Sequence, residues 1–185
     1  MSGSTDVKDV QLVKCDSETE MKGVKSFDCG DDVINKFIPQ LKRQCGRDNI
    51  NALLLLDGDK KLFGFATATL YQLGRDGIPE DTYPYALPPA IAVMKIPMIA
   101  IDKQLQRQGW GHDLLRAILD YSVESADLVK GIKGVYLDAK VDARSFYESF
   151  EFKALSETVS ENGTIPMLLP MDVLRESRKN WEQSA

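Results

Sequence analysis

The stretch that decides the fold is QLQRQGWGHDLLRAILDY, residues 104–121. Gly109 and Gly111 stand one residue apart in it, directly after the polar run Gln106, Arg107 and Gln108. The apolar residues that follow recur at the three- and four-residue spacing of one helix face, namely Leu114, Leu115, Ile118 and Leu119. The pattern predicts a glycine-containing turn that leads into an amphipathic helix.

A helix that begins at these glycines has a physical use. The first N–H groups of a helix have no partner within it and carry a partial positive charge, so they bind anions. Glycine has no Cβ to keep a phosphate away from them. Arg107 adds a positive charge and His112 a possible donor. The stretch therefore predicts a pyrophosphate-binding turn between a strand and a helix. It lacks GxxxxGK[ST] and the third glycine of the dinucleotide motif, and an ordinary glycine-containing tight turn remains an alternative.

The composition predicts one folded domain. The chain has 185 residues, of which 43% are hydrophobic and 28% charged, and its net charge is −5. That charge disfavours indiscriminate binding to nucleic acid or to an anionic membrane. No apolar run reaches the roughly 20 residues that span a bilayer, and no secretory signal is expected. Three cysteines without CxxC spacing predict reduced thiols in the cytoplasm, and neither a disulfide framework nor a zinc site.

Helices and strands alternate along the chain. The apolar patterns predict strands at 10–15, 50–56, 62–70, 90–102, 135–139, 152–155 and 164–171. They predict helices from Asp31 or Asp32 to Leu41, from the glycines to about residue 129, and at 143–150. Pro39 is expected to kink or split the first helix, and Pro97 to cause a bulge or an edge. A long loop is expected at 73–90, and a turn at 131–134. This order predicts an α/β (α+β) fold with a mixed sheet.

Several motifs resemble the GNAT N-acetyltransferase superfamily. QRQGWG at 106–111 fits the [QR]xxGx[GA] acetyl-CoA signature, between the strand at 95–102 and a long helix. ARSFYE at 143–148 resembles the AxxFYE helix of the family, and Phe152 its closing phenylalanine. The resemblance covers roughly residues 10–155. It implies a GNAT-like single domain with a bulged, splayed strand. We expect a flexible N-terminus at 1–9, the acetyltransferase domain at 10–172, and a polar C-terminal helix or tail at 173–185.

The resemblance also implies a site and a mechanism. Acetyl-CoA would be the co-substrate, bound by Ile99, Ile101, Gln106, Arg107, Gln108, Gly109, Trp110, Gly111 and His112. A primary amine would attack the thioester directly, Tyr147 would act as general acid towards the thiolate, and no metal would take part. Ile99 and Ile101 could equally be core residues, and Tyr147 a packed aromatic residue. Because His112 is the only histidine, a Ser-His-Asp or Cys-His site is a poor alternative.

The acceptor is predicted to be an α-amine. An α-amine has a pKa of roughly 7.7–8.0 and needs no strong base, whereas a lysine amine near 10.4 does. No residue stands out as a base, although Glu80 or Asp81 in the long loop could serve.

FDCGDDVINKFIPQLKRQ at 27–44 resembles the opening of a branch of GNAT toxins that acetylate aminoacyl-tRNA. This branch implies a tRNA substrate, a ribbon-helix-helix antitoxin and a homodimer. The alternatives are acetylation of a small amine or a protein N-terminus, and a non-catalytic acyl-CoA-binding module.

Two residues depart from the family pattern. Glu151 replaces the glycine of the usual YxxxGF ending, so a residue with a side chain must adopt the turn, or the turn must change. Lys140 replaces an asparagine that often precedes the AxxFY helix.

Overall fold

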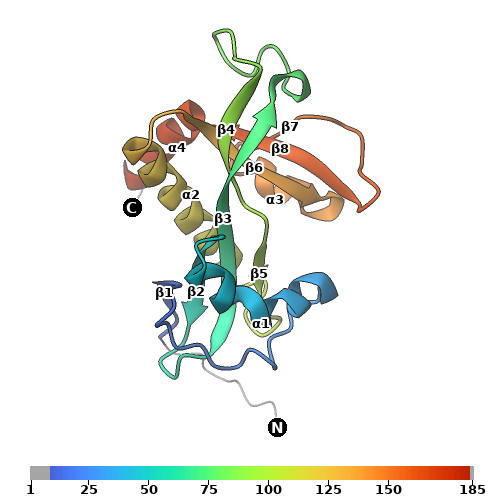
Figure 1. The fold of residues 1–185 in the computed structure, drawn as a ribbon. Helices are drawn as coiled ribbons and strands as arrows, with labels where there is room; N and C mark the ends of the chain where they lie inside the picture. The colour runs from blue at the N-terminus through green and yellow to red at the C-terminus, as the bar shows by residue number, and fades with distance from the viewer. Residues whose placement is uncertain (1–8, 184–185) are drawn as a thin grey trace. The chain divides into compact units, whose positions relative to one another are not determined.

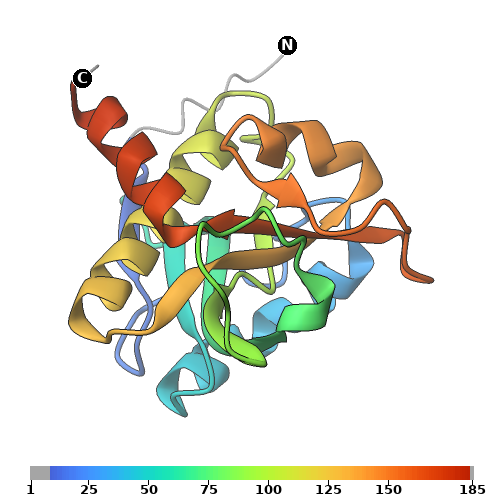
Figure 2. The same cartoon turned by 90° about the horizontal axis from the view of Figure 1, so that it is seen from above.

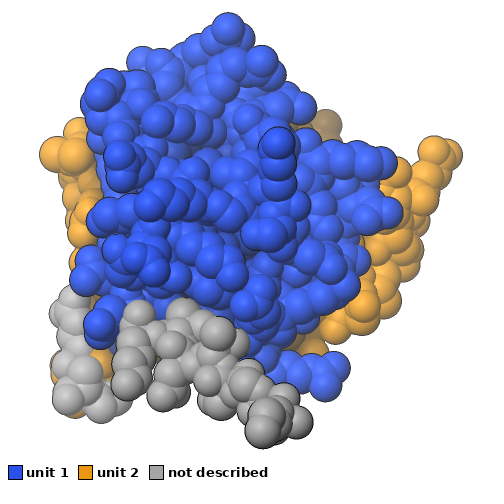
Figure 3. Space-filling model, turned by 90° about the horizontal axis from the view of Figure 1, so that it is seen from below, with its two compact units in different colours: residues 1–68, 98–118 blue, residues 69–97, 119–185 orange. Residues whose placement is uncertain are grey.

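The computed structural model describes residues 9–183, so residues 1–8 of the expected flexible N-terminus lie outside the described residues. The chain divides into two compact units, which Figure 3 colours separately. Of the described residues, unit 1 comprises 9–68 and 98–118, and unit 2 comprises 69–97 and 119–183. Strand β3 (Leu62–Gly74) and helix α2 (Trp110–Leu128) each contribute residues to both units.

Unit 1 contains a helix and an antiparallel sheet. The strands are β1 (Gln11–Lys14), β2 (Asn51–Leu56), the first part of β3, and β5 (Ile99–Ile101), hydrogen-bonded in that order (Figure 1). Helix α1 (Asp32–Gly46) packs its apolar face against β2 and β3. The buried core of unit 1 consists of Cys15, Phe27, Ile38, Leu41, Cys45, Ala52, Leu54, Leu56, Leu62, Phe65 and Ala100.

Helix α1 begins at the predicted cap. The Asp31 carboxylate accepts hydrogen bonds from the N–H groups of Val33 at 2.9 Å and Ile34 at 3.3 Å, which an N-cap residue is expected to do. The helix is not split at Pro39 and continues to Gly46. A proline inside a helix costs about 3 kcal/mol, whereas full burial of the neighbouring Ile38 and Leu41 contributes about 1.5–3 kcal/mol each. Burial of this face therefore outweighs the proline.

Unit 2 contains a mixed sheet. Its strands are the second part of β3, β4 (Ala90–Lys95), β6 (Ile132–Lys140), β8 (Thr164–Pro170) and β7 (Lys153–Ala154), in that order. Strands β4 and β6 run parallel and the other pairs antiparallel, which confirms the predicted mixed sheet. The helical segments are η1 (Arg75–Gly77), η2 (Val141–Ala143), α3 (Arg144–Glu148), α4 (Met171–Gln183) and the second part of α2.

The C-terminal segment is helical as far as the described residues extend. Helix α4 lies beside the second part of α2 (Figure 2), where Arg175 pairs with Asp127 at 2.7 Å and Arg178 with Asp120 at 2.9 Å.

Between residues 9 and 183, no helix combines the length and the apolar character that crossing a membrane requires. All three cysteines are free thiols; Cys15 and Cys45 are buried and Cys29 is partly buried.

Two predicted boundaries in unit 2 were wrong. Strand β3 continues past Leu70 to Gly74 and pairs with β4 there, so the expected loop at 73–90 is shorter and contains η1. Strand β6 begins at Ile132, and Gly134 lies inside it rather than in a turn. A Cβ at Gly134 would lie 2.7 Å from the carbonyl oxygen of Leu169. This glycine therefore permits a close approach of β6 to β8. From the sequence alone, a glycine in this role cannot be distinguished from a glycine in a turn.

The predicted bulge at Pro97 is confirmed as a break between β4 and β5. Residues 67–68 of β3 oppose three residues, 96–98, across the break. The buried Thr67 compensates for the irregular pairing: its N–H donates to the carbonyl of Met98 at 2.8 Å, and its hydroxyl accepts a hydrogen bond from the Met98 N–H at 3.1 Å. A side-chain hydroxyl thus replaces a backbone partner at the break.

Replacing Thr67 with valine is expected to destabilise the protein. Valine has the same shape but leaves the N–H of the half-buried Met98 without its acceptor, which costs about 1–3 kcal/mol in the free energy of unfolding. Chemical denaturation measures this loss, and hydrogen exchange is expected to show a Met98 amide that has lost its protection. Thr67→Ser is the control, because it keeps the hydroxyl and should keep that protection. Protection that persists in Thr67→Val would contradict the assignment.

Candidate functional site

Strand β5 has one edge that no strand of the described residues occupies, since β5 pairs only with β3. The N–H of Asp102, just after β5, donates to the carbonyl of Phe63 on β3. Hydrogen-bonded positions recur every second residue in an antiparallel ladder. By the register of β5 on β3, Ala100 therefore directs its N–H and C=O towards β3, whereas Ile99 and Ile101 direct theirs towards the open edge. This edge offers backbone donors and acceptors to a ligand.

The turn after β5 is anchored by a carboxylate that sequence reasoning missed. Asp102, which is 2% exposed, accepts hydrogen bonds from the N–H groups of Asp28 and Gln104, each at 2.9 Å. The Asp28 carboxylate in turn pairs with Lys103 at 2.6 Å. The hydrogen bond from Lys103, followed by those from Gly30 and Asn35, lowers the pKa of Asp28 to about 2. The segment around Asp28 is thereby fixed to the turn, which a pattern of adjacent residues could not reveal.

The glutamines predicted to bind the cofactor have structural partners. The side-chain amide of Gln106 donates to the carbonyls of Ile101 at 2.8 Å and Cys29 at 3.0 Å. That of Gln108 donates to the carbonyl of Gln104 at 2.9 Å. Both side chains therefore hold the shape of the turn, and Gln106 also links it to the segment before α1.

The start of α2 has the geometry of an anion site. Arg107 and Gly109 adopt left-handed backbone conformations, with φ of 61° and 90°. The N–H groups of His112 and Asp113 donate to the carbonyl of Gly109. Those of the two preceding helix residues, Trp110 and Gly111, have no acceptor among residues 9–183.

Side chains leave this start accessible. A Cβ on Gly111 would come no closer than 3.9 Å to another residue, the nearest being Ile101, so the protein's own packing does not require a glycine there. Arg107 and His112 are both exposed, and Trp110 is half-buried. The arrangement can bind a phosphate group through backbone N–H groups with a cation beside them.

Tyr147 lies on α3 in unit 2 and is buried, with 9% of its surface exposed. Its ring packs edge-on against Phe146 and Phe152. Burial raises the pKa of the phenol to about 12. The hydroxyl has no hydrogen-bond partner among the described residues. The hydroxyl oxygen is nevertheless not fully buried, because every fully buried side-chain N or O atom of the described residues has a hydrogen-bond partner. The ring is therefore fixed while its hydroxyl keeps an open side.

Glu151 adopts the turn that the family pattern assigns to glycine, with φ of 69°. Such a conformation costs a residue with a Cβ about 1–2 kcal/mol. A helix distant in sequence supports it: the hydroxyl of the buried Ser177, on α4, donates to the Glu151 carboxylate and also contacts the carbonyl of Val173. Lys140, the other departure, ends β6 opposite Thr164.

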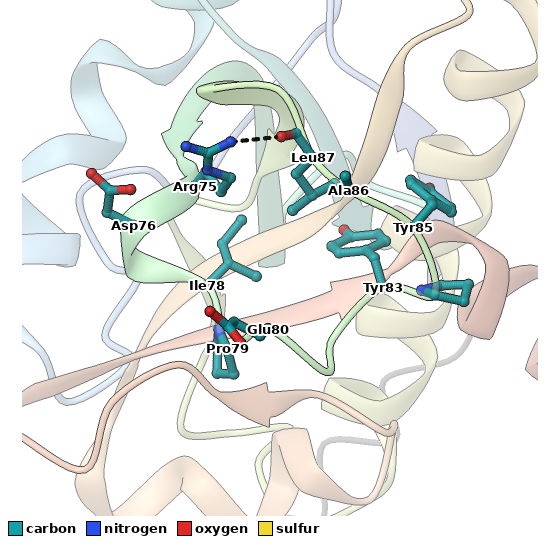
Figure 4. A pocket seen from close by; sticks show the side chains of 10 residues that line it. Arg75, Asp76, Ile78, Pro79, Glu80, Tyr83, Tyr85, Ala86 and Leu87 are labelled. Carbon is teal, nitrogen blue, oxygen red and sulfur yellow. Dashed lines mark hydrogen bonds between the residues drawn. The ribbon is translucent and has the colours of Figure 1, made fainter.

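The remaining candidates lie elsewhere. Glu80 lines a cavity of about 790 Å³ formed by residues 75–87 of unit 2, whereas Asp81 does not (Figure 4). In the described part of the chain, no group of three or more His, Cys, Asp or Glu side chains could hold a metal ion. All the predicted cofactor residues belong to unit 1, and Tyr147 belongs to unit 2.

The chain is similar in sequence and in fold to known proteins. The family model of the acetyltransferase (GNAT) domain matches residues 15–174. No curated protein sequence matched the chain. Among solved structures, a bacterial toxin shares 30% identity, with 92% of this chain and 95% of the toxin covered and a TM-score of 0.86. These matches confirm the expected GNAT-like domain.

Two further structures share the fold at lower identity. AtaT complexed with acetyl-methionyl-tRNAfMet is 24% identical, with 90% of this chain and 98% of AtaT covered and a TM-score of 0.77. AtaTR bound with acetyl-CoA is also 24% identical, with 90% and 96% covered and a TM-score of 0.74.

Proposed function

We propose, because the chain belongs to the acetyltransferase (GNAT) domain family, that it moves an acetyl group from acetyl-CoA to the α-amine of aminoacyl-tRNA and so blocks translation. The observation that carries this proposal is the 30% identity to a bacterial toxin over 92% of the chain. The likeness in fold to AtaT, solved with acetyl-methionyl-tRNAfMet, supports the choice of acceptor.

The start of α2 and the open edge of β5 would hold the co-substrate. The N–H groups of Trp110 and Gly111 and the charge of Arg107 suit the pyrophosphate of CoA. The backbone groups of Ile99 and the N–H of Ile101 suit the amides of pantetheine, whereas the carbonyl of Ile101 already accepts a hydrogen bond from Gln106. Acetyl-CoA supplies an activated thioester, and the protein's task is to orient it.

Tyr147 would act on the leaving group. The acceptor amine forms a bond to the thioester carbonyl carbon, the carbon–sulfur bond breaks, and its electron pair goes to sulfur. The surplus amine proton passes to water. A phenol with a pKa of about 12 keeps its proton throughout the working range. A thiol has a pKa near ~8.5, which is lower than that of this phenol, so Tyr147 first stabilises the thiolate by donating a hydrogen bond to it. The proton is transferred only where exclusion of water makes the sulfur more basic.

The toxin assignment brings further proposals. We expect a cytoplasmic protein, a homodimer, and a ribbon-helix-helix antitoxin encoded nearby. A solved structure of AtaT bound to the C-terminus of its antitoxin AtaR provides the precedent. The alternatives are acetylation of a small amine or a protein N-terminus, or a module that binds acyl-CoA without turnover.

Purified protein with radiolabelled acetyl-CoA tests the acceptor. Aminoacylated tRNAs, the same tRNAs without an amino acid, small amines and peptides with free N-termini are supplied in parallel. We expect label only in aminoacyl-tRNA, released by mild alkali as an N-acetyl amino acid. Label confined to amines or peptides would establish the alternative acceptor. Binding of acetyl-CoA without transfer to any acceptor would indicate the non-catalytic module.

The pH dependence follows from the two ionising groups. kcat/KM should rise between about pH 6.5 and 8.5 as an α-amine of pKa roughly 7.7–8.0 loses its proton. It should then stay level through about pH 10, because the active form of Tyr147 is protonated and a raised pKa keeps it so. An initial-rate profile with saturating acetyl-CoA measures both limbs. A tyrosine with the ordinary pKa of about 10 would halve the rate at that pH, and such a fall would contradict the raised pKa of Tyr147.

A further inference from the structure

The cavity in unit 2 has no role in the proposed reaction. It is a half-open cavity of about 790 Å³ between η1 and the start of β4, and its volume is within the range of sites for drug-sized ligands (Figure 4). Its inner wall is apolar: Ile78 and Tyr83 are buried members of the unit 2 core, and Leu87 packs against that core. Two tyrosines line one side, Tyr83 and the half-exposed Tyr85.

The walls are fixed by contacts of their own. The Tyr83 hydroxyl donates to the carbonyl of Lys133 at 2.9 Å. The Lys133 ammonium group lies 5.0 Å from the centre of the Tyr85 ring. At the other end the Arg75 guanidinium donates to the carbonyl of Leu87 at 3.0 Å, which joins the two ends of the loop. A cavity held in this way needs little reorganisation to receive a ligand.

Charges of both signs line this cavity. Arg75 retains N–H groups beyond the one bound to Leu87. Asp76 and Glu80 are exposed, and neither carboxylate pairs with another described residue. A ligand with an ammonium at one end, a carboxylate at the other and an apolar body can pair with Glu80 and Arg75.

The loop backbone is also open. From Tyr83 to Leu87 no N–H group donates to another residue within the described range. Unpaired backbone groups beside an apolar wall are what a bound peptide segment uses. We propose that the cavity formed by residues 75–87 binds a short peptide with free termini and apolar side chains, its carboxylate facing Arg75 and its ammonium facing Glu80. This binding requires neither acetyl-CoA nor turnover, so it is independent of the proposed function.

A set of blocked peptides tests the proposal. The probe is a tripeptide of leucine, phenylalanine and alanine, used with free termini, N-acetylated, C-amidated, or blocked at both ends. Methyl NMR of Ile78 and Leu87 in the full chain gives the Kd of each. We expect saturable shifts with the free peptide, and about three- to tenfold weaker binding after blocking either end.

Two variants assign the ends. In Glu80→Gln, N-acetylation should no longer weaken binding while C-amidation still does; in Arg75→Gln the opposite should hold. Asp59→Asn, an exposed carboxylate in a unit 1 turn, is the control and should bind as the wild type does. Folding of each variant is checked by its unperturbed core methyl signals. The proposal is overturned if the doubly blocked peptide binds as tightly as the free one, or if neither methyl group shifts at about 10 mM peptide.

Discussion

Tyr147→Phe is expected to lower kcat for an α-amine acceptor by about 10²–10⁴-fold, the usual contribution of a positioned acid. The ring keeps its contacts with Phe146 and Phe152, so packing is retained and only the hydroxyl is lost. The Kd for acetyl-CoA should change less than threefold, because the hydroxyl acts on charge that develops only as the carbon–sulfur bond breaks. Single-turnover kinetics and titration calorimetry measure the two quantities separately.

Tyr136→Phe is the matched control. Tyr136 is also buried, and its hydroxyl donates to the Asp138 carboxylate at 2.7 Å. Its loss should lower stability by about 0.5–1.5 kcal/mol and leave kcat within about twofold of the wild type. Equal kinetic losses in both variants would mean that Tyr147 contributes through structure. Full activity in Tyr147→Phe would show that the thiolate leaves without an acid.

Gly111→Ala is expected to separate stability from cofactor affinity. The added methyl group has space, since its nearest neighbour is 3.9 Å away, and alanine favours a helix over glycine by up to about 1 kcal/mol. The melting temperature should therefore stay the same or rise. The methyl group would stand where a phosphate approaches the N–H groups. Loss of one charge-assisted hydrogen bond, about 1.5–3 kcal/mol, should weaken acetyl-CoA binding by about 10–100-fold.

Gly58→Ala serves as the comparison. Gly58 also has open space around the position of a Cβ but lies in the turn between β2 and β3. Its replacement should leave the acetyl-CoA affinity unchanged in a binding titration. If Gly111→Ala binds acetyl-CoA as tightly as the wild type, the pyrophosphate does not lie against the start of α2.

The sequence predicted features that arise from neighbouring residues. The cap at Asp31, the break at Pro97 and the helix after Gly109 all depend on a few adjacent residues. The missed residues act over long separations. Asp102 accepts from the N–H of Asp28, 74 positions earlier, and no local pattern predicts such a pairing. The acetyl-CoA signature predicts that Gln106 and Gln108 contact a ligand. In the structure, their side-chain amides donate to backbone carbonyls of the protein itself.

The boundary errors have a related cause. A glycine in the sequence can indicate either a turn or a close approach of two strands. At Gly134 the second applies, because the carbonyl oxygen of Leu169 on β8 lies close to it. The outer part of β3 is largely exposed and lacks the alternation of a half-buried strand. Its regular structure comes from pairing with β4, a partner that periodicity cannot identify.

The hydrogen bond from Ser177 to Glu151 makes the residue type at one of these positions depend on the residue type at the other. We expect that, in related chains, a glycine at position 151 leaves position 177 free to vary, whereas a glutamate there favours a small hydroxyl residue on the last helix. Such pairs should covary across an alignment. A search pattern that insists on the glycine would pass over chains of this kind, and one that accepts either pair would recover them.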